Sequence, residues 1–175
     1  MFVLHGFVLS ECRFQRNQGI RNNLGLRGVA IVNQLGHADC PDQVLSRLEQ
    51  AIETAVSNGV TNFYVGNRGA FDRLAVTAVK RAKKKFPEVR LYLLLACHPA
   101  ERPQALPEGF DGTYYPLEKI PPRRFAIVRA NEAMLRQADH VICYVDHVGN
   151  TRKLLELAQK RRSVTIDNIA QRSQE

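Results

Sequence analysis

Short apolar runs alternate along this chain with longer stretches in which apolar residues recur every three or four positions. Short apolar runs over 28–33, 62–65, 89–96, 140–145 and 163–167 predict strands, and the almost continuous run over 89–96 is of the kind covered on both faces. The helical period over 41–57, 71–86, 123–137 and 151–160 predicts amphipathic helices between them. Together they predict an α/β fold, a doubly wound and mostly parallel sheet of about five strands with helices on both faces.

One long segment breaks the alternation. Residues 97–122 contain six prolines, which cannot continue a helix and remove backbone donors. We expect an irregular crossover here, of the length that often carries function.

The two ends of the chain differ from its middle. Residues 1–27 intersperse arginines with Asn, Gln and Gly without any lasting period, so we expect a poorly ordered basic extension. Residues 28–167 then form one domain, followed by a tail over 168–175. No apolar run reaches the length of a membrane span, and the start lacks the pattern of a signal peptide. The four cysteines form no CxxC pair, which favours reduced thiols and a cytoplasmic protein.

The net charge adds little to the functional prediction. There are 25 Lys and Arg residues against 17 Asp and Glu residues, a net charge of +8, and much of the excess lies in residues 80–85 and 152–162. Both runs fall near predicted helix ends, where cations complement the helix dipole. We expect solvated helix ends, and a nucleic-acid surface is the less favoured alternative.

Two apolar runs end in a glycine turn that leads into a helix, over 63–72 and 141–151. At the carboxyl end of a parallel strand, glycine lets backbone N–H groups approach a ligand, and the helix N-terminus favours an anion. A phosphate or nucleotide site is therefore one interpretation, and an ordinary strand-to-helix turn is the other. The candidate ligand residues of the two turns are Gly66, Asn67, Arg68, Gly69, Asp72, Gly149, Asn150 and Thr151.

Several candidate side chains have both a ligand-binding and a structural interpretation. The Asp72 carboxylate is placed to accept from a ribose hydroxyl, or to complement the helix N-terminus. Thr151 or Asn150 would cap its helix whether or not a ligand is present. Arg129 is a candidate phosphate clamp and Asn131 a candidate contact to a base or sugar, although polar helix positions explain both. Several histidines follow strand ends, but their spacing matches no metal pattern, so we expect no metal site.

Several short motifs, in order along residues 28–167, resemble the SLOG superfamily. They are Leu35 to His37, Tyr64 to Asp72, Pro122 to Phe125, Arg129 to Met134, Asp139 to Ile142, and Gly149 to Thr151 with Ala158. Within it the chain is similar to the YpsA-like group of bacterial proteins of unknown function, and more distant from the LOG phosphoribohydrolases and the DNA-processing protein DprA. The resemblance implies a Rossmann-like fold, a site for a nucleotide or nucleotide-derived molecule that includes Gly36 and His37, and self-association.

The chain departs from its relatives at three positions. Ala38 stands where the group usually has an arginine, and Gly149-Asn150 replaces a Gly-Gly pair. LOG-like hydrolases carry a glutamate three residues after the threonine of the last loop, where this chain has Leu154. Leucine cannot act as an acid or base. We therefore expect a nucleotide sensor or binding module without a cofactor. The alternatives are a nucleoside monophosphate N-glycosidase, which leaves enzymatic activity open, and a DNA-associated, DprA-like protein.

Overall fold

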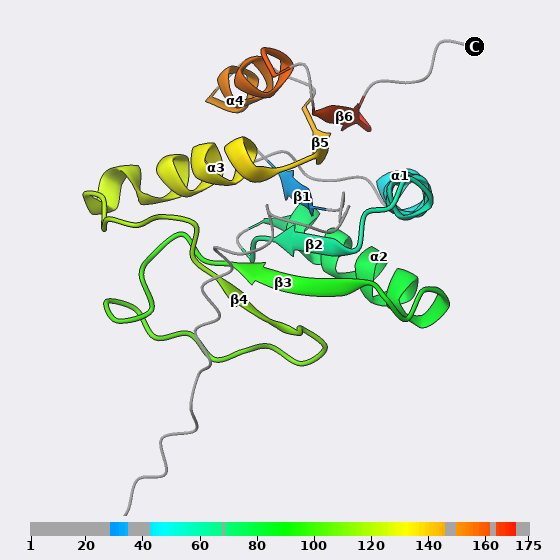
Figure 1. Cartoon of the computed structure of the whole chain (residues 1–175), viewed down its shortest axis with the longest axis horizontal. Coiled ribbons are helices and arrows are strands. Elements are labelled where there is room, and N and C mark those ends of the chain that lie inside the picture. Colours follow the sequence, from blue (N-terminus) through cyan, green and yellow to red (C-terminus); the bar gives the residue numbers. More distant parts are fainter. Residues whose placement is uncertain (1–28, 35–42, 68, 146–149, 162–163, 171–175) are drawn as a thin grey trace, which may run out of the picture.

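The computed structural model of the chain describes residues 29–34, 43–67, 69–145, 150–161 and 164–170 (Figure 1). The expectations for residues 1–27, and for a cap of the first helix at Asp39 or Cys40, lie outside these residues. Six strands form one sheet in the order β4-β3-β2-β1-β5-β6, and each neighbouring pair is parallel. In chain order the strands are β1 (Val29–Gln34), β2 (Asn62–Val65), β3 (Arg90–Leu94), β4 (Gly112–Tyr114), β5 (His140–Tyr144) and β6 (Thr165–Asn168).

Helices cover both faces of this sheet, which confirms the predicted doubly wound architecture. The helices are α1 (Gln43–Ser57), α2 (Ala70–Lys85), α3 (Ala126–Gln137) and α4 (Asn150–Gln159), and a short 3₁₀ turn, η1 (Arg123–Phe125), leads into α3. In Figure 1, α1 and α2 lie on one side of the strands, whereas α3 and α4 lie on the other. β1 lies near the centre of the sheet, and β2, β3 and β4 follow one another outward on one side of it. The chain then returns to the other side of β1, where β5 and β6 lie.

Alternating side chains divide the core into two layers. On β2, Phe63 and Val65 pack in the cluster formed with α1 and α2, whereas Tyr64 packs in the cluster that includes Met134 of α3 and Leu154 of α4. Each strand residue therefore contributes apolar area to one layer or the other, which is why the central strands read as almost continuous apolar runs.

The proline-rich segment corrects one expectation. Most of residues 97–122 is irregular, as predicted, but Gly112–Tyr114 pairs with β3 and adds a sixth strand at the sheet edge. A contact distant in sequence holds it there, because Oδ2 of Asp111 accepts the Leu91 N–H at 2.7 Å and a hydrogen bond from the Lys83 ammonium at 2.6 Å. A three-residue strand is too short to leave a period in the sequence.

No helix within the described part of the chain has the length and apolar character needed to cross a membrane.

Candidate functional site

The turn between β2 and α2 is built around the carboxylate of Asp72. Its Oδ2 atom accepts the backbone N–H of Gly69, the N-cap residue of α2, at 3.1 Å. Only 4% of Asp72 is exposed. A carboxylate in the first helical turn satisfies a backbone donor and complements the positive end of the helix dipole. The helix-terminus role that the sequence left open for Asp72 is therefore present in the fold.

Gly66 fits this turn because it has no side chain. A Cβ atom at Gly66 would lie 2.9 Å from Asp72 Oδ2, closer than such atoms approach in real structures. The glycine therefore lets the strand end pass against the buried carboxylate, and the turn that follows β2 stays narrow.

A cavity of about 470 Å³ opens beside this turn, at the carboxyl ends of β2 and β3. Its volume falls in the range of small-molecule sites. The residues that line it come from the β2 turn, from the end of β3 and from the proline-rich segment: Asn67, Leu94, Ala96, Cys97, Arg102, Pro103, Gln104 and Ala105.

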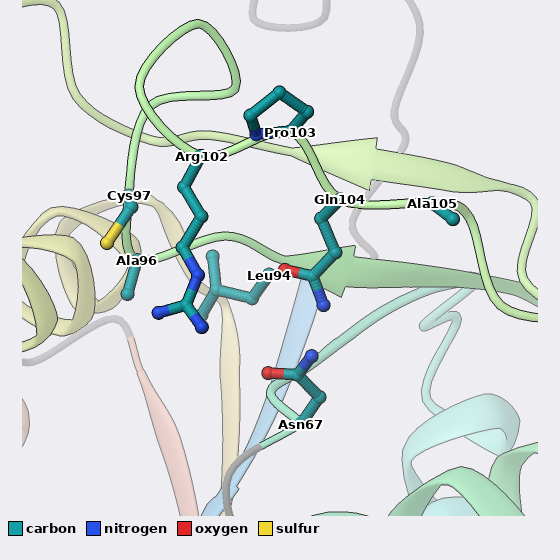
Figure 2. A pocket seen from close by; sticks show the side chains of 8 residues that line it. All are labelled: Asn67, Leu94, Ala96, Cys97, Arg102, Pro103, Gln104 and Ala105. Atoms are coloured by element: carbon teal, nitrogen blue, oxygen red, sulfur yellow. The ribbon is translucent and has the colours of Figure 1, made fainter.

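Polar groups from two separate loops converge in this cavity. Figure 2 shows the guanidinium of Arg102 and the amides of Asn67 and Gln104 extending into the same space, with Leu94 and Ala96 behind them. Among the described lining residues, Arg102 carries the only formal charge. The cavity therefore combines several hydrogen-bond donors with one positive charge and short apolar walls.

The aromatic side chains on the neighbouring strands stay neutral. Tyr64 stacks on Tyr92 with ring centroids 5.1 Å apart, and Tyr114 meets Tyr64 edge-on at 5.1 Å. Burial raises the pKa of all three phenols, and the Tyr114 hydroxyl donates to Gln137 at 2.7 Å. They serve as packing groups and not as bases near neutral pH.

The structure brings together the four described residues of the β2 turn, Gly66, Asn67, Gly69 and Asp72, and places the other described candidates on α3 and at the start of α4. Arg129 is exposed on α3 and forms an ion pair with Glu132 at 2.9 Å, and Asn131 is half-buried on the same helix. Asn150 and Thr151 begin α4. The candidates Gly36, His37, Arg68 and Gly149 lie outside the described residues. Their contacts to a ligand remain predictions.

Sequence reasoning did not single out Arg102, Gln104 or Cys97. The run of prolines indicated a long crossover of the functional kind, but no motif marked the residues that would turn toward the sheet. Their position depends on how this segment folds back over the end of β3.

Several residues of the basic runs make contacts within the fold. At the end of α2, Arg81 pairs with Glu49 at 2.5 Å, Lys83 with Asp111 at 2.6 Å and Lys85 with Glu53 at 2.5 Å. On the other face, Arg161 donates to the carbonyls of Leu135 and Ala138 at the end of α3. In a parallel sheet these helix ends lie at the amino edge, opposite the cavity.

Two apolar side chains of α3 and α4 are buried. Met134 is 1% exposed and Leu154 is 5% exposed, and both belong to the core layer under α3 and α4. Leu154 is thus a packing residue.

The chain is similar in structure to two proteins of known architecture. One is DNA processing protein A from Helicobacter pylori, which binds single-stranded DNA, with a TM-score of 0.55, 16% identity, and coverage of 86% of this chain and 68% of the other. The second is the molybdenum cofactor carrier protein from Chlamydomonas reinhardtii, with a TM-score of 0.50, 13% identity, and coverage of 80% and 74%. No family model matches the sequence, and no curated protein matches it. These similarities show the fold, a Rossmann-like α/β sheet.

Proposed function

We propose that this protein binds a nucleotide or nucleotide-derived molecule at the carboxyl edge of its sheet and acts as a sensor or binding module. One observation carries the proposal. The glycine turn after β2 contributes Asn67 to a cavity of small-molecule size, directly beside the N-terminus of α2. Ligands of open α/β sheets bind at this edge, and helix N-termini there favour phosphate.

Proteins of related fold bind ligands, which supports a binding role for this chain without identifying its ligand. One neighbour binds single-stranded DNA and the other carries a molybdenum cofactor, so the fold accommodates ligands of different kinds. Membership of the YpsA-like group, a cytoplasmic location and self-association belong to the same proposal. They rest on the resemblance of the motifs and on the cysteine pattern.

The hydrolase alternative is less well supported by the two described residues that bear on its acid or base. Leu154 is packed in the core, and the carboxylate of Asp72 is buried and engaged by the Gly69 N–H. The DNA-associated alternative is weakened because part of the basic surface it needs is paired within the fold: Arg81, Lys83 and Lys85 form ion pairs with carboxylates.

A thermal-shift screen tests the proposal, preceded by native mass spectrometry of the purified protein to reveal any bound ligand. The screen compares mono-, di- and cyclic nucleotides, NAD and ADP-ribose. A true ligand at 100 times its Kd should raise Tm by roughly 5–10 °C. Asn67→Ala should reduce this shift, and Gln50→Ala on the exposed side of α1 is the matched control.

The outcomes separate the alternatives. A shift that Asn67→Ala abolishes and Gln50→Ala preserves would support the site. An equal rise in Tm in all three proteins would show that the ligand does not bind at the β2 turn. Release of free base from a bound nucleotide would favour the N-glycosidase, and retention on single-stranded DNA that falls steeply with salt would favour the DNA-associated protein. No ligand in either assay would contradict the proposal.

A further inference from the structure

We propose that the cavity between the β2 turn and the proline-rich segment is an oxyanion subsite, in which Arg102 holds a phosphate group of the ligand. The inference rests on the proposed function for the source of that phosphate, and on the geometry of the cavity for the site itself. It assigns the anion contact to a residue outside every motif that the sequence indicated.

Arg102 is available for such a contact. Within the described part of the chain, its guanidinium has no ion pair and no hydrogen bond, and the contact it makes is through its backbone N–H to the carbonyl of His98. Its side chain instead extends into the cavity (Figure 2). By contrast, Arg81, Arg129 and Arg161 all have protein partners.

The other polar side chains in the cavity are also donors. The amide groups of Asn67 and Gln104 each carry two N–H donors, and both extend toward the space that Arg102 occupies (Figure 2). A phosphate presents several oxygens to a guanidinium and to neighbouring amides at once, and Arg binds such groups through two parallel hydrogen bonds.

The composition of the walls favours an anion over a cation. The described lining residues contain no carboxylate, and Leu94, Ala96, Pro103 and Ala105 supply apolar surface. Asn67, Arg102 and Gln104 are exposed to solvent, so the attraction rests on direct hydrogen bonds between the guanidinium and the oxyanion.

The first experiment measures affinity by isothermal titration with AMP, ADP, adenosine, inorganic phosphate and pyrophosphate. The test variant is Arg102→Gln. Arg136→Gln is the matched control, because it makes the same charge change on the exposed end of α3. Arg102→Gln should weaken binding of the phosphorylated ligands about tenfold or more and leave adenosine unaffected. The Tm of each variant without ligand checks that it is folded.

A second readout uses the thiol that lines the cavity. Cys97 is half-buried in the cavity wall, whereas Cys143 is buried in the core and serves as an internal control for unfolding. Alkylation of the Cys97 peptide by iodoacetamide, followed by mass spectrometry, should slow about tenfold or more when AMP, ADP or pyrophosphate is present at 100 times its Kd. Arg102→Gln should remove this protection at the same ligand concentration.

The results distinguish failure of the subsite from failure of the proposed function. Nucleotides that bind the wild type and Arg102→Gln equally, without protecting Cys97, would overturn the subsite and leave nucleotide binding intact. If no nucleotide binds, protection of Cys97 by pyrophosphate that depends on Arg102 would still support an oxyanion site. Absence of protection by every anion would overturn it. Protection of Cys97 by single-stranded DNA alone would show that the cavity contacts a nucleic acid. It would contradict a site for a small phosphate ligand.

Discussion

Gly66 and Asp72 are in such close contact that a methyl group on the glycine would lie 2.9 Å from the carboxylate oxygen Oδ2. That oxygen is fixed, because it accepts the Gly69 N–H at 3.1 Å and is buried. Gly66→Ala should therefore displace the carboxylate from the helix N-terminus and lower the free energy of unfolding by about 1 kcal/mol. Urea denaturation followed by circular dichroism measures this loss.

A double-mutant cycle tests the cause. If the cost of Gly66→Ala arises at the carboxylate, it should shrink to a few tenths of a kcal/mol in an Asp72→Ala background, where the crowding atom is gone. The same cost in both backgrounds would show that Gly66 is needed for another reason.

Asp72→Asn separates the two roles of this side chain. An amide oxygen still accepts the Gly69 N–H, so we expect the free energy of unfolding to change by less than about 1 kcal/mol. If the carboxylate also contacts a ribose hydroxyl, nucleotide affinity should fall by about tenfold. Titration calorimetry with the ligand identified in the thermal screen measures it, and unchanged affinity would leave Asp72 with a purely structural role.

The sequence predicted most of the fold because the central strands are covered on both faces. Phe63 and Tyr64 are adjacent, yet each is buried in a different layer, so the run is apolar throughout and easily recognised. β4 was missed because its position depends on Asp111, which bonds to residues about 20 and 28 positions away. Contacts of that kind leave no local period.

The candidate site was predictable only where the backbone itself dictates the residue. Gly66 stands out because the turn needs a residue without a side chain. In the sequence Arg102 and Gln104 are ordinary loop residues, and they line the cavity only because the loop folds over the end of β3. Arg161 was expected among solvated basic residues, but it bonds to α3 carbonyls through a contact between two helices.

Arg161 is a structural residue of the α3–α4 face. Its guanidinium donates to the carbonyls of Leu135 and Ala138, which lie at the end of α3 where helix carbonyls lack internal partners. Arg161→Ala should lower the free energy of unfolding by about 1–3 kcal/mol. Lys160→Ala, an exposed neighbour with the same loss of charge, should change it by less than about 0.5 kcal/mol. Equal effects in the two variants would assign the loss to charge alone.

Asp111 should hold the proline-rich segment on the sheet. Oδ2 accepts both the Leu91 N–H and the Lys83 ammonium, and the two charged side chains are about three-quarters buried. Asp111→Ala should cost about 1–3 kcal/mol and raise hydrogen exchange across β4. Glu108→Ala, in an exposed part of the same segment, is the control. Unchanged exchange in Asp111→Ala would show that β4 is held by its strand pairing alone.

Stability at alkaline pH should depend on Cys143. Burial, with a smaller contribution from Asp167, raises the pKa of this thiol from 9.0 to about 12. Below pH 9 the thiol is protonated in both the folded and the unfolded chain, so its contribution is constant. Above pH 9 the unfolded chain loses the proton while the folded chain keeps it, and stability should fall by about 1.4 kcal/mol by pH 10.

The comparison with Cys143→Ala isolates this effect. The raised phenol pKa values of Tyr64, Tyr92, Tyr114 and Tyr115 start from 10.0, so these phenols begin to contribute to the decline near pH 10, and they do so equally in both proteins. Urea denaturation at half-unit steps from pH 7 to pH 10 measures the slope. Cys143→Ala lowers stability at every pH by leaving a small cavity, but it should flatten the decline between pH 9 and pH 10. Parallel curves for the two proteins would mean that another group causes the alkaline loss. A steeper fall of the free energy of unfolding in the wild type would show that the buried thiol causes the difference.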